Sequence, residues 1–307
     1  MQKYLILLIV LISSTWSVNG QNEAHYTQFM HNKLVLNPAY AGSKEALTFT
    51  ALYRNQWSGV EGAPTTYNVN AHTAFFDKRC GAGISIVGDQ HGFYKTFNIG
   101  LDYSYRIPMQ NGATFSLGLS GNIEYGKVDF TLIDPFEMDD EDIPMNGDVR
   151  LKPNFGLGAY YSHPKYYIGL SAPNVMRSSI YNSNPSTDPN FNKMRSYYLM
   201  GGFMTRINHA VQFKPAVLLT FNPSAPFEMD MNASFLFMDK VWIGASYRLG
   251  DSVDAMLQYQ FTPQLRAGVA VDLTTSELNN YSPGSFEMMI EYGLNYEGKG
   301  LNHLRFF

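Results

Sequence analysis

The sequence has one cysteine, few charged residues and no long apolar run after its first residues. The one cysteine, Cys80, cannot form a disulfide within the chain, and we expect it to be a small residue at a strand end. Charged residues make up 16% of the sequence, whereas soluble domains have ~25%. The formal net charge is −4, and basic residues do not cluster. No nucleic-acid partner is therefore expected.

Residues 1–20 are predicted to be a secretory signal peptide. Lys3 supplies a basic start, an apolar run extends from Tyr4 to Ile12, and small residues precede a cleavage point at Gln21. The run is too short to span a bilayer as a helix, which takes ~20 residues. No later run reaches the ~18 apolar residues of a transmembrane helix, so none is expected.

Alternation of apolar and polar residues dominates the rest of the chain, which is rich in Tyr and Phe. One stretch places Phe97, Ile99 and Leu101 on one face and small or polar residues between them. A period of two indicates β-strands, because a helix would repeat every three or four residues. We expect about fourteen strands. They begin near Leu47, Thr66, Cys80, Thr96, Ala113, Asn154, Tyr166, Tyr197, Val211, Phe227, Val241, Val253, Leu265 and Phe286.

The expected connections are short after even-numbered strands and often long after odd-numbered strands. Short ones follow even-numbered strands, as at 77–79 and 238–240, and the long ones at 130–153, 172–196 and 275–285 follow odd-numbered strands. Bacterial outer-membrane barrels have short periplasmic turns and longer extracellular loops. The polar face consists mostly of Gly, Ser, Thr and Asn rather than Lys and Glu. That composition suits an enclosed lumen better than the water-facing side of a sandwich.

The sequence therefore predicts an all-β fold, a transmembrane antiparallel β-barrel of about fourteen strands over residues 46–307. It would lie in the outer membrane of a Gram-negative bacterium, in contact with outer-membrane lipid. Residues 21–45 would form a short N-terminal periplasmic arm, in which Asn37 and Pro38 predict a turn. The sequence leaves three placements open for this arm: under the barrel, inside it, or against a partner.

The sequence contains no motif for catalysis, cofactors or metals. Its seven histidines form no HExxH or Cys/His spacing, and GxSxG, GxGxxG and phosphate-binding glycine loops are missing. His72 is expected to face the lumen beside Asn68 and Asn70 as a polar filler. The acidic residues within 134–142 would be solvated in a long loop rather than bind a cation. We expect no enzyme activity, no catalytic residue and no cofactor.

The end of the first strand carries Arg54, Gln56 and Trp57. Arg54 has the parity of the lumen-facing residues of that strand, so its guanidinium must find partners inside the barrel. Lumen carboxylates such as Asp102 or Glu124 are candidates. Two roles remain open for Arg54, bracing of the barrel interior and contact with a cargo protein.

Short motifs are distributed along the chain in a characteristic combination. They include Tyr26-Thr27-Gln28-Phe29-Met30, Leu36-Asn37-Pro38-Ala39-Tyr40-Ala41-Gly42-Ser43, Tyr53-Arg54-Asn55-Gln56-Trp57, Gly62-Ala63-Pro64-Thr65, Pro153-Asn154-Phe155-Gly156, Trp242-Ile243-Gly244-Ala245-Ser246-Tyr247-Arg248 and Asp272-Leu273-Thr274-Thr275-Ser276-Glu277-Leu278. In this combination the chain resembles the PorP/SprF family of membrane proteins from the Bacteroidetes type IX secretion system. The resemblance covers almost the whole chain after the signal peptide.

The resemblance implies a non-enzymatic outer-membrane component that supports secretion or surface attachment of a cognate cargo, such as a gliding or adhesion protein. Its implied partners are the C-terminal secretion domain of that cargo and periplasmic peptidoglycan-associated and type IX secretion components. The motif residues whose role the resemblance does not specify are Asn37, Pro38, Ala39, Gly42, Arg54, Gln56 and Trp57.

Two other functions are compatible with the residues. A diffusion channel or small-solute transporter is possible, because fourteen strands lie between filled eight-stranded and open sixteen-stranded barrels. A surface hydrolase would require a Ser or His whose replacement abolishes activity on lipid.

Overall fold

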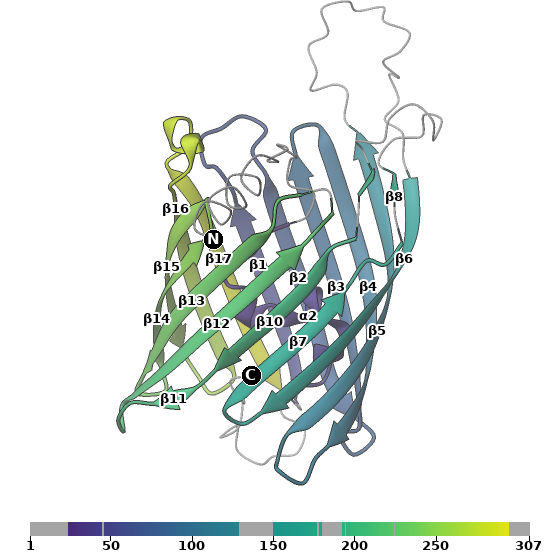
Figure 1. Ribbon diagram of the computed structural model, residues 1–307, viewed down its shortest axis with the longest axis vertical. Helices are drawn as coiled ribbons and strands as arrows, with labels where there is room; N and C mark the ends of the chain where they lie inside the picture. The colour runs from purple at the N-terminus through teal and green to yellow at the C-terminus, as the bar shows by residue number, and fades with distance from the viewer. Residues whose placement is uncertain are drawn as a thin grey trace, which may run out of the picture.

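Antiparallel strands, paired in chain order, form a closed barrel (Figure 1). The computed structural model describes residues 24–44, 46–128, 150–176, 178–179, 192–193, 195–223 and 225–294. The strands of the barrel are β1 Leu47–Asn55, β2 Thr65–Phe75, β3 Cys80–His91, β4 Tyr94–Pro108, β5 Thr114–Val128, β6 Arg150–His163, β7 Tyr166–Ala172, β10 Tyr197–Phe203, β11 Thr205–Arg206, β12 Val211–Phe221, β13 Glu228–Phe237, β14 Val241–Arg248, β15 Ser252–Gln260, β16 Leu265–Thr274 and β17 Gly284–Leu294. Strands β8 Ser178–Ser179 and β9 Asn192–Lys193 pair only with each other.

The barrel closes where its first and last strands meet. Strand β1 pairs with β17 from Leu47 opposite Leu294 to Asn55 opposite Phe286, and β10 pairs with both β7 and β12. Short β11 also pairs with β12, just after β10 in the chain, so the ring has fourteen strand positions. Closure leaves no open sheet edge, which hydrocarbon would not tolerate. The predicted fourteen-stranded antiparallel barrel is confirmed.

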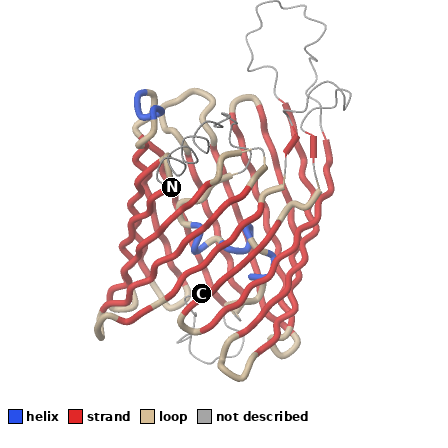
Figure 2. Tube along the Cα trace, in the orientation of Figure 1, coloured by secondary structure: helices blue, strands red, loops and turns tan. Residues whose placement is uncertain are grey.

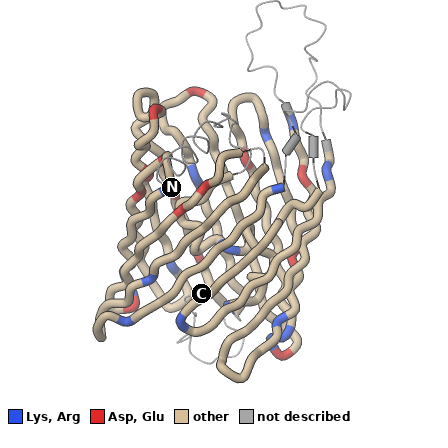
Figure 3. The backbone as a smooth tube through the Cα atoms, viewed as in Figure 1, with Lys and Arg blue, Asp and Glu red and all other residues tan. Residues whose placement is uncertain are grey.

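The side chains of each strand alternate between lipid and lumen. In β1, Phe49 and Tyr53 are exposed on the outside, whereas Thr48, Thr50 and Arg54 are buried inside. The same alternation holds in β14, β15 and β17. Figure 3 shows that the strands facing the viewer carry few charges. The outer surface is therefore an apolar band, as a lipid environment requires.

The two ends of the barrel differ in the length of their connections. One end has short turns, such as 76–79 and 238–240, and the other has the long connections 129–149 and 173–196. As predicted, the long connections lie at one end, although that end also has the short connections 92–93 and 249–251. The end with long loops is extracellular in bacterial barrels. The acidic residues within 134–142 and the predicted signal peptide lie outside the described residues.

The N-terminal arm, residues 24–44, enters the barrel. It forms the short helices η1 (Phe29–His31), α2 (Lys33–Leu36) and η2 (Pro38–Tyr40), which Figure 2 shows within the cylinder of strands. None of the helices that the structure describes is long and apolar enough to cross a bilayer. The sequence left three placements open for the arm, and the structure shows the one inside the barrel.

The hydrophobic core of the protein lies in the lumen, between the arm and the inner wall. The buried arm residues pack against wall residues of β6, β7, β10 and β12. The core consists mainly of Tyr26, Phe29, Leu34, Leu36, Ala39, Tyr40, Ala41, Tyr160, Tyr167, Tyr198, Met200 and Leu218. The arm thus covers apolar side chains of the inner wall, which would otherwise face water in the lumen.

Two further expectations concern single residues. His72 is buried in the lumen on the same face as Asn68 and Asn70, as expected. Cys80 is the first residue of β3 and is buried, with its sulfur 3.2 Å from the hydroxyl of Tyr103.

The apolar band makes a depth-dependent prediction for β4. Leu101 lies at the centre of this strand and is 62% exposed, whereas Ile107 lies near its turn end and is 42% exposed. We expect Leu101→Arg to destabilise the barrel folded in a bilayer by about 2–4 kcal/mol and Ile107→Arg to destabilise it by about 0–1 kcal/mol. Urea titrations in lipid vesicles measure both values, and equal small losses would contradict a lipid-facing outer surface.

Candidate functional site: the arm and its seat in the barrel

Asn37 attaches the middle of the arm to the barrel wall. Its Oδ1 accepts a hydrogen bond from the Ala39 N–H at 2.9 Å and so caps η2. Its Nδ2 donates to the carbonyl oxygens of Ala159 on β6 at 3.0 Å and Leu170 on β7 at 3.5 Å. Pro38 is the first residue of η2. Proline suits this position because the backbone N–H that it lacks would have no partner within the helix. The asparagine and proline therefore turn the chain and anchor it at the same point.

Luminal glycines let the arm backbone approach the wall closely. A Cβ added at Gly118 on β5 would overlap the η2 backbone, and one at Gly81 on β3 would overlap the Ala41 carbonyl. A Cβ at Gly158 on β6 would overlap the Asn37 amide. We call Gly81, Gly118 and Gly158 the glycine seat. Any larger residue there would have to displace the arm.

Gly42 meets the glycine seat from the side of the arm. Its φ of +74° is one that other residues rarely adopt. A Cβ there would also lie 2.9 Å from the Cα of Gly81. The Gly42 N–H donates to Nδ1 of His72 at 3.1 Å, and the hydroxyl of Ser104 donates to the Ala41 carbonyl at 2.7 Å. Backbone conformation and space thus both require glycine at position 42.

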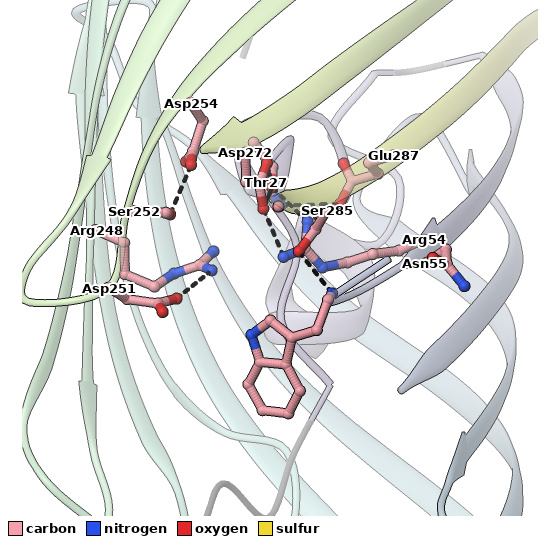
Figure 4. A network of polar contacts seen from close by, with 12 residues as sticks. Thr27, Arg54, Asn55, Arg248, Asp251, Ser252, Asp254, Asp272, Ser285 and Glu287 are labelled. Atoms are coloured by element: carbon pink, nitrogen blue, oxygen red, sulfur yellow. Dashed lines mark hydrogen bonds and ion pairs between the residues drawn. The ribbon is translucent and has the colours of Figure 1, made fainter. Parts of the chain in front are cut away.

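Arg54 connects the beginning of the arm to the last strands (Figure 4). Its guanidinium donates to Asp272 at 2.6 Å and to the Thr27 hydroxyl at 2.6 Å, and lies 3.6 Å from Glu287. The carboxylate of Glu287 accepts the backbone N–H groups of Thr27 and Gln28, each at 2.9 Å. Arg54, Asp272 and Glu287 are almost fully buried. We call these three residues with Thr27 the arginine anchor.

The expected inward orientation of Arg54 is confirmed, but the partners proposed for it were wrong. Asp102 on β4 and Glu124 on β5 are three and four strands away from β1. Barrel closure instead makes β17 the neighbour of β1 and places Glu287 directly opposite Arg54. Asp272 comes from β16, the next strand around the ring.

A second charged cluster lies beside the arginine anchor (Figure 4). Arg248 donates to Asp230 at 2.7 Å and to Asp251 at 3.3 Å. Asp254, which accepts a hydrogen bond from Ser252, is the cross-strand neighbour of Asp272. Carboxylates outnumber arginines on this part of the wall, which favours the hydrogen-bond donors of the arm.

Two lysines of the arm, Lys33 at the beginning of α2 and Lys44 just before β1, contact the wall. Lys44 forms an ion pair with Glu291, which also accepts from Arg266 at 2.9 Å. The ammonium of Lys33 lies 3.8 Å from the ring centre of Tyr167. Burial lowers the pKa of Lys33 well below its usual range and lowers the pKa of Lys44. Both lysine side chains are buried among groups of the wall rather than in bulk water, and cation–π contacts strengthen when water is removed.

Gln56 and Trp57 lie in the first extracellular loop. The Trp57 N–H donates to the hydroxyl of Ser285 at 3.1 Å, and the Ser58 N–H donates to the Gly284 carbonyl at 2.8 Å. Gln56 is buried at the beginning of this loop. The seven motif residues therefore divide into two groups, five that hold the arm and two that begin a loop joined to the last strand.

The acidic residues of the last strand and the glycine seat were not identified from the sequence as contacts of the arm. Glu287 and Glu291 lie on the luminal face of the last strand, and in any closed barrel that strand adjoins the first. Parity and ring closure together could have identified Glu287 as the partner of Arg54. Glycines within strands indicate bends or close packing, but the segment that packs against the seat glycines depends on where the arm lies.

The part of the chain that the structure describes contains no group of three His, Cys, Asp or Glu residues placed to hold a metal ion. The chemistry available at the arm is that of hydrogen bonds, ion pairs and close packing. Such an arrangement can bind and position a segment of chain.

Comparisons with known proteins agree with this fold. A family model described as "Type IX secretion system membrane protein PorP/SprF" matches residues 18–292. No curated protein matches the sequence. Among solved structures, the CymD monoaromatic hydrocarbon channel is 11% identical with a TM-score of 0.52, covering 92% of this chain and 96% of that chain. A TodX deltaS2S3 mutant monoaromatic hydrocarbon channel is 11% identical with a TM-score of 0.50, covering 86% and 94%. Identities this low show similarity of fold alone.

The glycine seat predicts a difference between two glycines of β5. Gly118→Ala would place a methyl group in the η2 backbone, whereas a Cβ at lipid-facing Gly121 meets no atom within 4 Å. We expect Gly118→Ala to destabilise the docked arm by about 1–3 kcal/mol and Gly121→Ala to leave it docked. Limited proteolysis of the arm in detergent measures docking. Equal protection of the arm in both variants would contradict the seat.

The arginine anchor predicts a large effect for Arg54→Met. Removing the guanidinium leaves Asp272 and Glu287 buried without their cation, which costs about 3–5 kcal/mol of unfolding free energy. Adding Asp272→Asn should recover part of that loss, because one of the two stranded charges is then removed. Urea unfolding of the single and double variants measures this coupling, and strictly additive losses would argue against it.

Proposed function

The chain belongs to the PorP/SprF family of type IX secretion system membrane proteins and lies in the outer membrane, and from this premise we propose that it supports a cognate cargo protein. The cargo would be a gliding or adhesion protein, which this barrel helps to secrete or to hold at the cell surface. The mechanism would be binding, without catalysis. The cargo's C-terminal secretion domain would dock on the extracellular loops, and periplasmic components of the system would engage the short turns.

The observation that carries this proposal is the arm docked in the lumen. The arm is held at its beginning by the arginine anchor, in its middle by Asn37 and the glycine seat, and at its end by the Lys44–Glu291 ion pair. A passage filled by a segment so anchored favours a role in docking over free diffusion. The surfaces then left for protein partners are the two ends of the barrel.

The extracellular end supports docking because hydrogen bonds join two of its loops. Loop 56–64 and loop 275–283 are joined through Ser58, whose N–H donates to Gly284 and whose carbonyl accepts from the hydroxyl of Ser282 at 3.1 Å. Tyr281 is 78% exposed next to this joint, and Leu278 and Val60 are also exposed. Exposed apolar and aromatic residues on a fixed platform are typical of protein interfaces.

The alternative is a channel for small solutes. Two solved barrels of similar fold are named as channels for monoaromatic hydrocarbons, but that likeness concerns fold alone. A channel role would require the arm to leave the lumen or to shift within it. Stable conductance of the purified wild-type protein in planar bilayers would favour this alternative.

The docking hypothesis is tested by surface display of the cargo. Deleting the gene should remove the cognate adhesin from the cell surface, and the wild-type gene should restore it. We expect Tyr281→Ala combined with Leu278→Ala to restore display only in part, because the docking platform loses its apolar side chains. Antibody labelling of intact cells measures display.

The matched control is Phe155→Ala, which truncates an exposed apolar residue on strand β6. This variant should restore display fully, and the heat-shifted gel band of the folded barrel controls for expression. Normal adhesin display in the deletion strain would refute the proposed function.

A further inference from the structure

A cavity of about 150 Å³ lies in the lumen, between the arm and the wall formed by β3 to β6. Leu34, Val35 and Leu36 of the arm line one side. The wall opposite is polar, with Asn98 and Asn122 facing the cavity. Its position is toward the extracellular end, because its lining includes residues where β3 ends and β4 begins.

Asp102 lines this cavity from the middle of β4. The residue is 8% exposed, and its Oδ2 is buried with no hydrogen-bond partner among the described residues. Its cross-strand neighbours are Gly83 on β3 and Ser120 on β5, neither of which carries a charge. A buried carboxylate is costly unless a donor or cation satisfies it. Among the residues that the structure describes, no lysine or arginine forms an ion pair with Asp102.

The charged residues of the cavity lie away from Asp102. Lys95 is on the same strand but seven residues away, roughly 24 Å at ~3.4 Å per residue. Lys152 is paired in register with Glu124, near the extracellular end of β5 and β6. Lys127 and Asp89 also lie toward that end. The outer part of the cavity carries both positively and negatively charged residues. Neither a cationic nor an anionic ligand would therefore meet only like charges as it enters.

The apolar side of the cavity lies next to this carboxylate. The methyl groups of Leu34 are 3.1 Å from a Cβ built on Gly83, the residue opposite Asp102. A ligand reaching Asp102 would therefore contact leucine with its remaining atoms. Engineered protein cavities of ~150 Å³ hold a benzene molecule, so the space suits a body of that size.

We propose that this cavity binds a small amphipathic organic cation. Its ammonium or guanidinium group would donate to Asp102, and its apolar body would pack against Leu34 and Leu36. The charge-assisted hydrogen bond supplies specificity, because a neutral or anionic analogue leaves the carboxylate unsatisfied or repelled. This site goes beyond the proposed function and does not depend on it, since it requires no cargo protein.

The test uses the full-length protein in detergent and isothermal titration calorimetry. Benzylammonium is the probe, benzyl alcohol is the neutral isostere and benzoate is the anion. We expect one benzylammonium to bind per chain, at least about tenfold more tightly than benzyl alcohol, the difference that one charge-assisted hydrogen bond provides. Benzoate should give no heat of binding.

Two variants locate the binding site. Asp102→Asn should weaken benzylammonium binding by about tenfold or more. The matched control is Asp89→Asn, which neutralises another carboxylate of the same cavity. It should change binding by less than about twofold, because Asp89 pairs with Thr96, six residues from Asp102 along β4, roughly 20 Å at ~3.4 Å per residue, and charges that far apart are screened. No binding of benzylammonium to the wild type, or equal binding by wild type and Asp102→Asn, would overturn the proposal. Should Asp102→Asn fail to fold, equal affinities of benzylammonium and benzyl alcohol for the wild type would also overturn it.

Discussion

Closure of the strand ring is the constraint on which the rest of the structure depends. Hydrocarbon offers no partner for a free backbone N–H or carbonyl, so fourteen strands must pair on both sides. Closure then forces each strand to present one face to lipid and the other to an enclosed lumen. It also brings the first strand against the last, and this contact places Arg54 opposite Glu287. The arginine anchor is therefore a consequence of closure.

The lumen of a barrel this wide has to be filled by water, by ligand or by the chain itself. Here the arm fills its middle, and the wall is adapted to the arm in two ways. Glycines remove side chains where the arm backbone lies close, and buried carboxylates and carbonyl oxygens accept its hydrogen bonds. The apolar residues of the arm in turn cover the apolar residues of β6, β7, β10 and β12. Arm and wall together make one core.

The position of the arm bears on the proposed function because the arm lies in the lumen, between the two ends of the barrel. In the proposed function, partners would use the extracellular platform around Tyr281 and the short turns at the opposite end. The cavity beside Asp102 lies on the extracellular side of the arm. A small ligand there would contact both the wall and Leu34, so its binding and the docking of the arm would favour each other.

The alternation of residues and the unequal connections were sufficient to predict the barrel, its strand number and the inward orientation of Arg54, because a period of two and loop length are local properties of the chain. The motifs also identified Asn37, Pro38, Ala39 and Gly42 before their contacts were known. The position of the arm and the partners of Arg54 could not be predicted in the same way. Both depend on contacts between residues far apart in the chain, such as Thr27 with Asp272 or Asn37 with Leu170. Only the closed ring decides which of these residues face each other across the lumen.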